Sequence, residues 1–384
     1  MSPQRFLIIG GGVVGASAAY RLSSTGHEVT VVDARRADAA SPAAAGVISP
    51  GSVFAYGGTA PAGFAPLAVA ASRHYAGLVA SLRTDGYDDC GYSQPGALVV
   101  ATNDDEVARL DGVLTCVEER RALGAANIGE PARLDADAAR ALHPLLGEET
   151  REVIHLPEVA RVDGRKLVAA LLGAAEKHGA EVVDDEVRLV ARDGGVVVES
   201  TSGRAYEADR YIVAAGSWTP QVVAGLGIDL PVGAESGEMV YVRLPEAPTG
   251  VPLVMGFVHT RYTLPVGPQE FGLGATQRPP AEPIGVKAAG IAAILAETTR
   301  VSPAFGGAFI ERLTVGNRPT TPDHLPILGE LGDTGTVFVA SGHGSYGLMQ
   351  GPYSGALIAD LAAGGEIDLD LAPYAPGRFA ESGR

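Results

Sequence analysis

The sequence is poor in cysteine, in positive charge and in long apolar runs. Its 384 residues include two cysteines, Cys90 and Cys116, too few for a disulfide framework or a cysteine-based metal cluster. No stretch approaches the ~20 apolar residues of a membrane span, and the N-terminal apolar run, residues 6–9, is too short for a secretory signal. The 29 Lys and Arg residues against 45 Asp and Glu give a net charge of −16, which argues against nucleic-acid and anionic-membrane partners. We therefore expect a cytoplasmic protein without a metal site.

A glycine-rich turn follows the first strand-like segment. Residues 6–9, Phe-Leu-Ile-Ile, are wholly apolar, as is typical of a parallel strand buried on both faces. The next six residues, 10–15, form the pattern G-x-G-x-x-G. Gly10 permits the tight turn out of the strand, Gly12 lets the backbone approach a pyrophosphate, and Gly15 lets the next helix pack closely on the sheet.

The segments after this turn complete a dinucleotide-binding unit. We expect a helix over residues 13–24, whose N-terminus directs unpaired N–H groups and the positive end of its dipole at the phosphates. A second strand, residues 29–32, leads to Asp33, whose carboxylate can accept hydrogen bonds from both ribose hydroxyls. Order and spacing thus predict an adenine dinucleotide site. These residues alone leave open whether the cofactor is FAD or NAD.

Two further features follow Asp33. Arg35 and Arg36 are close enough in sequence to reach the edge of the pyrophosphate, and solvated surface arginines are the alternative. Residues 41–50 have small and almost uncharged side chains, which suits backbone that lies against a flat aromatic cofactor. A buried connection without a special role is the alternative for this Ala-rich segment.

The rest of the chain predicts a second domain inserted into the first. Helical patterns cover residues 66–82, 104–123, 134–142, 165–178 and 285–299. Residues 181–206 predict a β-meander, residues 211–218 a buried strand, and residues 230–280 and 308–315 a set of alternating strands. We expect an α/β fold with a Rossmann-like domain, a parallel sheet plus the meander, over residues 1–85, 150–228 and 312–384. Residues 86–149 and 229–311 would form an α+β substrate domain on a mixed, largely antiparallel sheet.

Three later segments carry a family resemblance. They are residues 214–218 (AAGSW), 316–329 (GNRPTTPDHLPILG) and 337–352 (VFVASGHGSYGLMQGP). Together with the glycine-rich turn and the Ala-rich segment, in this order, they resemble the FAD-dependent D-amino acid oxidase and glycine oxidase family. The resemblance covers nearly the whole chain. It implies a two-domain flavoprotein in which FAD lies extended in the first domain and a mixed sheet of the second domain covers the flavin ring.

The resemblance also implies which residues contact FAD. Asp33 corresponds to the ribose ligand, Val187 to the backbone position that meets the adenine, and Gly216 to the turn beside the pyrophosphate and ribityl chain. The N-terminus of the final helix, residues 347–362, would face the side of the ring where negative charge develops on reduction. The expected cofactor-binding residues are Gly10, Gly12, Val13, Val14, Gly15, Asp33, Ala34, Arg35, Ser41, Ala45, Gly46, Val47, Val187, Ala215, Gly216, Trp218, Arg318, Gly344, Ser345, Tyr346, Gly347, Leu348 and Met349.

Three residues are expected at the substrate. Arg318 stands where the family places the arginine that binds the substrate carboxylate, and its planar fork can form two charge-assisted hydrogen bonds; a loop ion pair is the alternative. Tyr262 corresponds to a tyrosine that reaches the same carboxylate, or it is a packed strand residue. His343 adds a hydrogen bond near the flavin, or it is a structural histidine.

The chain departs from the family pattern at three points. Ser236 stands where the family often has Arg or Lys, just before a glycine in one strand of the sheet that covers the flavin. Ser345 and Tyr346 stand where glycine oxidase-like sequences often carry Arg and Asn, and the loss of that second cation argues against a bare amino acid held by two arginines. No cysteine follows Cys116, so the cysteine that holds flavin covalently in sarcosine oxidase-like members is missing and FAD should be non-covalent.

We therefore expect oxidation of the C–N bond of a small amino acid, of the glycine or D-amino acid type, by FAD. Hydride transfer to flavin would give an imine that water hydrolyses, with oxygen or another acceptor taking the electrons, and positioning in a dry pocket would carry most of the effect. A secondary-amine or sarcosine-like oxidase, or a tailoring oxidase for a larger nitrogen compound, is the alternative. An NAD-dependent dehydrogenase and a flavin-binding subunit without turnover are the competing classes. A homo-oligomer is compatible with each.

Overall fold

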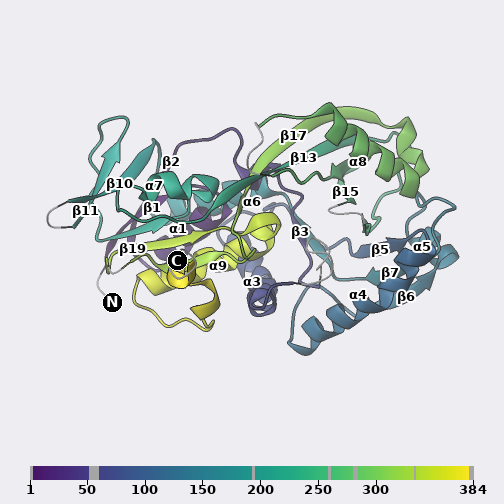
Figure 1. Ribbon diagram of the computed structural model, residues 1–384, viewed down its shortest axis with the longest axis horizontal. Helices are drawn as coiled ribbons and strands as arrows, with labels where there is room; N and C mark the ends of the chain where they lie inside the picture. The colour runs from purple at the N-terminus through teal and green to yellow at the C-terminus, as the bar shows by residue number, and fades with distance from the viewer. Residues whose placement is uncertain are drawn as a thin grey trace.

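The molecule is elongated, with a sheet toward each end and two long strands, β13 (Gly233–Arg243) and β17 (Phe309–Thr320), that run from its middle into the second sheet (Figure 1). The computed structural model describes residues 3–51, 60–192, 195–257, 261–279, 284–332 and 334–379. Within these ranges the fold is the α/β architecture that the sequence predicts, with a Rossmann-like parallel sheet and a mixed, largely antiparallel sheet.

The first sheet has six strands in the described part of the chain. All neighbours are parallel except β18, which is antiparallel to β19. Side chains of β1 alternate between two apolar layers, with Phe6 and Ile8 in one and Leu7 and Ile9 in the other, which explains the continuous apolar run. The order across the sheet is β18 (Ile327–Glu330), β19 (Val337–Ser341), β12 (Arg210–Val213), β1 (Arg5–Ile9), β2 (Glu28–Asp33) and β9 (Glu181–Asp184).

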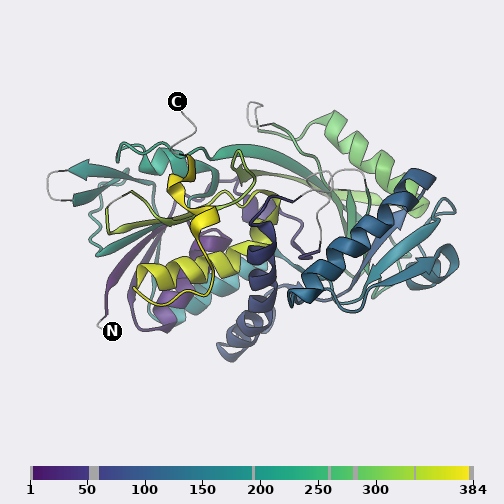
Figure 2. The same ribbon diagram turned by 60° about the horizontal axis from the view of Figure 1, so that its bottom comes forward.

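Helices α1 (Val13–Ser24), α6 (Gly164–Lys177) and α9 (Gly347–Ala362) pack on one face of this sheet. The long helix α3 (Phe64–Thr84), dark blue in Figure 2, crosses the yellow α9 and packs on it. The hairpin of β10 (Val187–Arg192) and β11 (Gly195–Ser200) packs with the short helix α7 (Thr219–Val223) on the other face. Because α1 follows β1 directly and α9 follows β19, both helices begin at the carboxyl edge of the parallel strands.

The mixed sheet lies between two helices. On β13, Val240 and Val242 face α8 (Ala288–Val301), whereas Met239 and Tyr241 belong to the opposite layer together with α4 (Asp104–Ala122). Neighbouring strands of the mixed sheet are antiparallel, except for β14 and β5, which are parallel to each other. The order is β17, β13, β16 (Glu270–Gly274), β15 (Tyr262–Gly267), β14 (Leu253–Met255), β5 (Ala97–Ala101), β7 (Glu152–Leu156) and β6 (Ala132–Asp135).

A small antiparallel sheet lies between the two larger ones. It consists of β3 (Val47–Ile48), β8 (Ala160–Val162) and β4 (Tyr92–Ser93). The Ala-rich segment therefore contains both the short helix α2 (Ala40–Ala43) and a strand, and β8 holds that strand through the pairs Val47 with Arg161 and Ile48 with Ala160.

One local expectation differs from the structure by two residues, and another was wrong. The helix expected over residues 134–142, with Asp135 at its opening, is α5 (Ala136–Leu142): the carboxylate of Asp135 accepts a hydrogen bond from the Ala138 N–H at 2.9 Å, and the helix starts two residues later than expected because β6 runs as far as Asp135. The expected meander is a two-stranded hairpin, because β9 pairs with β2 in the parallel sheet instead. The domain division stays a prediction; β7 lies in the mixed sheet although residues from 150 onward were expected in the first domain.

Among the described residues, no helix combines the length and the apolar character needed to cross a lipid bilayer. In the same part of the chain, no group of three or more His, Cys, Asp or Glu side chains is arranged to hold a metal ion.

Candidate active site

Two adjoining cavities open near the carboxyl edge of the parallel sheet. One, which we call the nucleotide cavity, lies between the β1–α1 turn and the β10–β11 hairpin, and the other, the roof cavity, lies beneath the mixed sheet. Because they share walls, they form one continuous, elongated site that passes the N-terminus of α1. The residues common to both are Gly12, Ala40, Ser41, Ala214 and Gly216.

Asp33 stands at the end of β2, inside the nucleotide cavity. Its Oδ2 accepts a hydrogen bond from the Gly11 N–H at 2.5 Å and its Oδ1 accepts one from the Arg35 N–H at 2.6 Å, so two backbone groups orient the carboxylate. A carboxylate has further acceptor positions, which stay available to hydroxyl donors. The predicted residues that line this cavity are Gly10, Gly12, Asp33, Ala34, Ser41, Val187, Ala215, Gly216 and Trp218.

Two predicted cofactor residues line neither cavity. The Arg35 guanidinium turns outward to Asp184, with 2.6 Å between Nε and Oδ1, and it is Arg36 that lines the nucleotide cavity, with its guanidinium over the Trp218 ring. Gly15 is buried beneath the turn, where a Cβ atom would lie 1.9 Å from the carbonyl oxygen of Gly10. Gly15 therefore serves the close packing of helix on sheet, while Arg35 forms an exposed ion pair outside both cavities.

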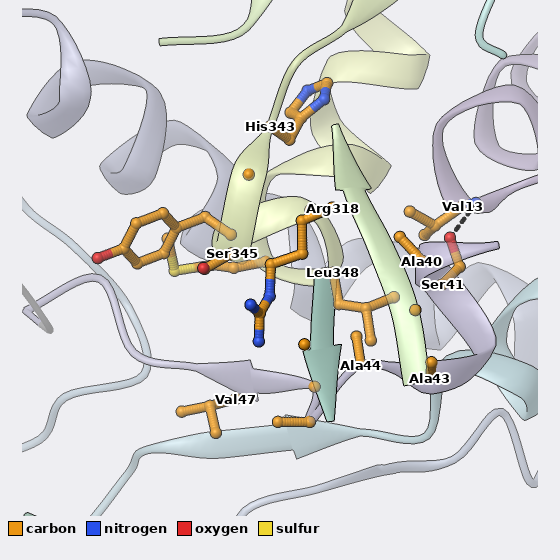
Figure 3. A pocket seen from close by; sticks show the side chains of 18 of the residues that line it. Val13, Ala40, Ser41, Ala43, Ala44, Val47, Arg318, His343, Ser345 and Leu348 are labelled. Carbon is orange, nitrogen blue, oxygen red and sulfur yellow. Dashed lines mark hydrogen bonds between the residues drawn. The ribbon is translucent and has the colours of Figure 1, made fainter. Parts of the chain in front are cut away.

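The floor of the roof cavity is built from small side chains and the start of α9. The Ser41 hydroxyl accepts a hydrogen bond from the Val13 N–H at 3.1 Å, which joins the Ala-rich segment to α1 (Figure 3). The Tyr75 hydroxyl of α3 donates to the Leu348 carbonyl and fixes the first turn of α9. The predicted residues along this floor are Val13, Val14, Ala45, Gly46, Val47, Gly344, Ser345, Tyr346, Gly347, Leu348 and Met349.

The roof carries two of the three predicted substrate residues, Arg318 and Tyr262, each lying over a glycine. A Cβ atom on Gly237 of β13 would lie 2.2 Å from the Nη2 atom of Arg318, and one on Gly274 of β16 would lie 2.3 Å from the ring of Tyr262. The missing side chains let the guanidinium and the phenol lie flat against the sheet on adjacent strands. Both residues line the cavity.

The guanidinium of Arg318 is held by one of its nitrogens. Nη1 donates to Glu235 Oε1 at 3.1 Å and to the Thr276 carbonyl at 3.0 Å. Both side chains of this pair are largely buried, at 15% and 14% exposure, and Glu235 Oε2 also accepts from the Gln277 amide at 2.7 Å. Figure 3 shows the fork of Arg318 directed into the space bordered by Ser345 and Val47.

Burial sets the protonation of the other two predicted residues. It lowers the pKa of His343 to about 4, so the imidazole is neutral at neutral pH, and its Nε2 has no hydrogen-bond partner among the described residues. Burial raises the pKa of Tyr262 to about 12, so the phenol keeps its proton and can donate a hydrogen bond. Figure 3 shows the His343 ring turned away from the Arg318 fork.

The model of a protein family described as FAD dependent oxidoreductase matches residues 5–361, which include the described residues of both cavities. The chain belongs to this family. As a family member it uses FAD as its cofactor, which decides between the two dinucleotides that the glycine-rich turn left open.

Relatives of this FAD-dependent oxidoreductase align over almost their whole length. An uncharacterized oxidoreductase of Bacillus subtilis, YurR, is 34% identical over 97% of this chain and 98% of its own. A glycine oxidase of Geobacillus kaustophilus is 30% identical over 96% of this chain and 95% of its own. The crystal structure of iminodiacetate oxidase from Chelativorans sp. BNC1 superposes with a TM-score of 0.88 at 33% identity, covering 97% of this chain and 99% of that one.

The chemistry of the combined cavity fits the family's cofactor. Apart from the Ser41 hydroxyl, which accepts from the Val13 N–H, no described side chain caps the N-terminus of α1 or α9, and the first turn of neither helix carries an acidic residue. Unpaired N–H groups and two positive dipole ends therefore point toward the cavity walls, where they suit a pyrophosphate and an electron-rich ring system. Neither Cys90 nor Cys116 lines either cavity within the described residues, and non-covalent binding of FAD stays a prediction.

Sequence reasoning missed several residues of this oxidoreductase's roof cavity. Arg261, Met239 and Met255 line it, although the pattern of the chain gave no reason to select them. Arg261 comes just before β15, where strand alternation no longer indicates which way a side chain points. Its position next to Tyr262 was the one signal that could have found it.

One strand connects the two halves of the site. Asn317 of β17 donates from its backbone N–H to the Asp38 carbonyl at 2.9 Å and from its amide group to Asp38 Oδ2 at 3.0 Å. Next to it, a Cβ atom on Gly316 would lie 2.6 Å from Ala43. The strand that carries Arg318 therefore also packs on α2, whose residues line the roof cavity and, through Ala40 and Ser41, both cavities.

Proposed function

We propose that this FAD-dependent oxidoreductase oxidises the C–N bond of a small amino acid to an imine, which water then hydrolyses. FAD would lie through both cavities, with the adenine toward the hairpin and the flavin beneath the roof. The observation that carries the proposal is the Arg318 guanidinium, which is largely buried and lies in the roof cavity with part of its fork free.

The free part of the fork suits a carboxylate. Among the described residues only Nη1 of Arg318 makes hydrogen bonds, which leaves Nε and Nη2 for a ligand. Two parallel N–H···O bonds to a carboxylate fix both its distance and its orientation. The Tyr262 hydroxyl, protonated at all pH values near neutral, adds a third donor.

The remaining chemistry requires positioning more than proton transfer. Bound FAD supplies the acceptor for the hydride that leaves the carbon next to nitrogen. Arg318 and Tyr262 would hold the amino acid so that this C–H bond keeps one orientation, and the small, apolar residues around them would keep water away. A substrate with a neutral nitrogen needs no strong base, and the neutral His343 imidazole adds no charge to the cavity.

A secondary amine is the second candidate substrate. Ser345, in place of the arginine of glycine oxidase-like sequences, lines the roof cavity and leaves more room near the nitrogen. The iminodiacetate oxidase whose structure is similar to this chain is named for a substrate with a secondary nitrogen.

The test is Arg318→Ala beside Arg318→Lys. We expect both variants to retain FAD and to lose at least about 100-fold in kcat/KM, because two charge-assisted hydrogen bonds of about 1.5–3 kcal/mol each depend on the fork. Anaerobic bleaching of the flavin by a panel of amino acids and amines measures the activity, and visible absorbance measures the bound FAD. Wild-type kinetics in Arg318→Ala would remove Arg318 from the substrate site, and a flavin that no amine bleaches would refute the proposed reaction.

A further inference from the structure

The roof cavity contains a second guanidinium, that of Arg261, which forms no ion pair with a carboxylate of the described residues. Arg261 lines the same cavity as Arg318, next to Tyr262 in the chain. Its Nη1 donates to the Ala275 carbonyl, and its buried Nε has no hydrogen-bond partner among the described residues. Burial lowers the pKa of this guanidinium, as expected for a cation partly withdrawn from water without a counter-ion.

The carboxylate whose charge acts on Arg261 is already engaged by another arginine. Glu297 is the carboxylate whose charge acts on Arg261, but its Oε1 lies 2.6 Å from Nη2 of Arg300 and its Oε2 accepts from Nε of Arg300 at 3.0 Å. Arg318 differs, because Glu235 lies 3.1 Å from it. In the described part of the chain, no Asp or Glu oxygen within 4 Å forms an ion pair with Arg261.

The charges of Arg318 and Arg261 both act on the hydroxyl group of Tyr262. Burial is the main influence on the pKa of the Tyr262 hydroxyl and raises it, while the charges of Arg318 and Arg261 both lower it. The hydroxyl therefore lies within electrostatic reach of both guanidinium groups, one on β17 and one at the start of β15. Met239 and Met255 line the same cavity and offer apolar contacts for methylene groups.

We propose that the substrate is an amine with two carboxylates, one bound by Arg318 and the other by Arg261. This inference rests on the proposed function, since it places the oxidised C–N bond between or beside these two anchors. Arg318 and Glu235 together carry no net charge, so among the described residues of the roof cavity Arg261 contributes the one positive charge that stays without a counter-ion. A dicarboxylate has a second anionic group for Arg261, whereas a substrate with one carboxylate leaves Arg261 without a counter-ion, whatever the protonation of its nitrogen.

Matched substrates test the second carboxylate. Iminodiacetate is N-methylglycine with a carboxylate added to the methyl group, and aspartate is alanine with a carboxylate added to its methyl group. For one of these two pairs, we expect kcat/KM of the dicarboxylate to be about 10- to 100-fold higher than kcat/KM of the monocarboxylate, as one charge-assisted contact predicts. Aspartate and alanine are each tested as both enantiomers. The preferred pair shows whether the second carboxylate is attached through nitrogen or through carbon.

Arg261→Gln should remove this preference, because it should raise KM of the dicarboxylate about 10- to 100-fold more than KM of the monocarboxylate. Arg261→Lys should restore part of it. Arg243→Gln is the control, because Arg243 lies on the same roof strand as Gly237 but forms an exposed ion pair with Glu311 at 2.8 Å. Equal losses for both members of a substrate pair in Arg261→Gln would overturn the proposal.

Binding without turnover separates this inference from the proposed function. Glutarate has the shape of iminodiacetate and butyrate that of N-methylglycine, but neither has a C–N bond to oxidise. We expect glutarate to perturb the visible spectrum of the FAD-loaded enzyme with a Kd about 10- to 100-fold below that of butyrate, and Arg261→Gln to abolish the difference. If no amine bleaches the flavin but glutarate binds through Arg261, the reaction is wrong and the second anion site stands. If amines are oxidised but both acids bind equally, the second anion site is wrong and the reaction stands.

Discussion

Replacing Gly237 with alanine tests whether the roof sheet sets the position of Arg318. The added Cβ atom would lie 2.2, 2.3 and 2.5 Å from Nη2, Cζ and Nη1 of Arg318, so the guanidinium must move by about 1 Å to reach ordinary contact. Gly237 lies in the extended strand β13, where alanine is tolerated. The atoms that must yield belong to the end of a flexible side chain. We therefore expect the fold to persist.

The expected effect is kinetic. A misplacement of about 1 Å can cost about 100-fold in rate, so kcat/KM for the best substrate should fall by about 10- to 100-fold while the FAD content and the melting temperature stay near those of wild type. Gly112→Ala in α4 is the control, because a Cβ atom there meets nothing within 4 Å. Steady-state kinetics and visible absorbance on the three proteins measure both quantities.

A double variant isolates the cause. If Gly237→Ala acts through Arg318, adding it to Arg318→Ala should cause no further loss, because the two changes remove the same interaction. Wild-type kcat/KM in Gly237→Ala, or full additivity of the two losses, would refute the reasoning that the glycine makes room for the substrate-binding fork.

Two further predictions concern the cofactor and acid stability. Asp33→Ala should weaken FAD binding by about tenfold or more, since it removes the oriented acceptor at the end of β2; FAD titration of apoprotein measures this, and unchanged affinity would exclude the carboxylate from the site. His143 is fully buried, both its ring nitrogens lack partners among the described residues, and burial lowers its pKa from 6.5 to about 4. The native state therefore binds fewer protons than the unfolded chain, so the stability that is present above pH 6.5 is lost as the pH falls toward 4. Between pH 6.5 and 4, denaturant unfolding should show that the free energy of unfolding of His143→Leu falls less than that of the wild type. An equal fall in both proteins would contradict this prediction.

The sequence predicted the parts of the site that local pattern determines. The helix expected over residues 13–24 coincides with α1, and the carboxylate of Asp33 stands in the nucleotide cavity, because strand, turn and helix here follow each other without a gap. The start of α9 was found for the same reason. A glycine-rich turn between a buried strand and a helix has few alternative conformations.

The parts that were missed depend on contacts between distant segments. The short β run at residues 181–183 fits a meander as well as a sheet edge, and only its pairing with β2 distinguishes the two. The choice between Arg35 and Arg36 depends on Asp184, about 150 residues away, which binds the first. Arg261 faces the cavity because of how the chain enters β15, and local sequence does not encode that direction.

The contact of β17 with both halves of the site limits how the substrate range of this enzyme can evolve. Asn317 is hydrogen-bonded to Asp38, and Gly316 packs on Ala43, so an insertion or a bulky residue near Arg318 would displace α2 and with it the cofactor wall. β15 has no such second role in the described structure, since its neighbours are β14 and β16 of the roof. Laboratory evolution toward new amines should therefore accumulate substitutions around Arg261 and Tyr262 and leave residues 316–318 unchanged.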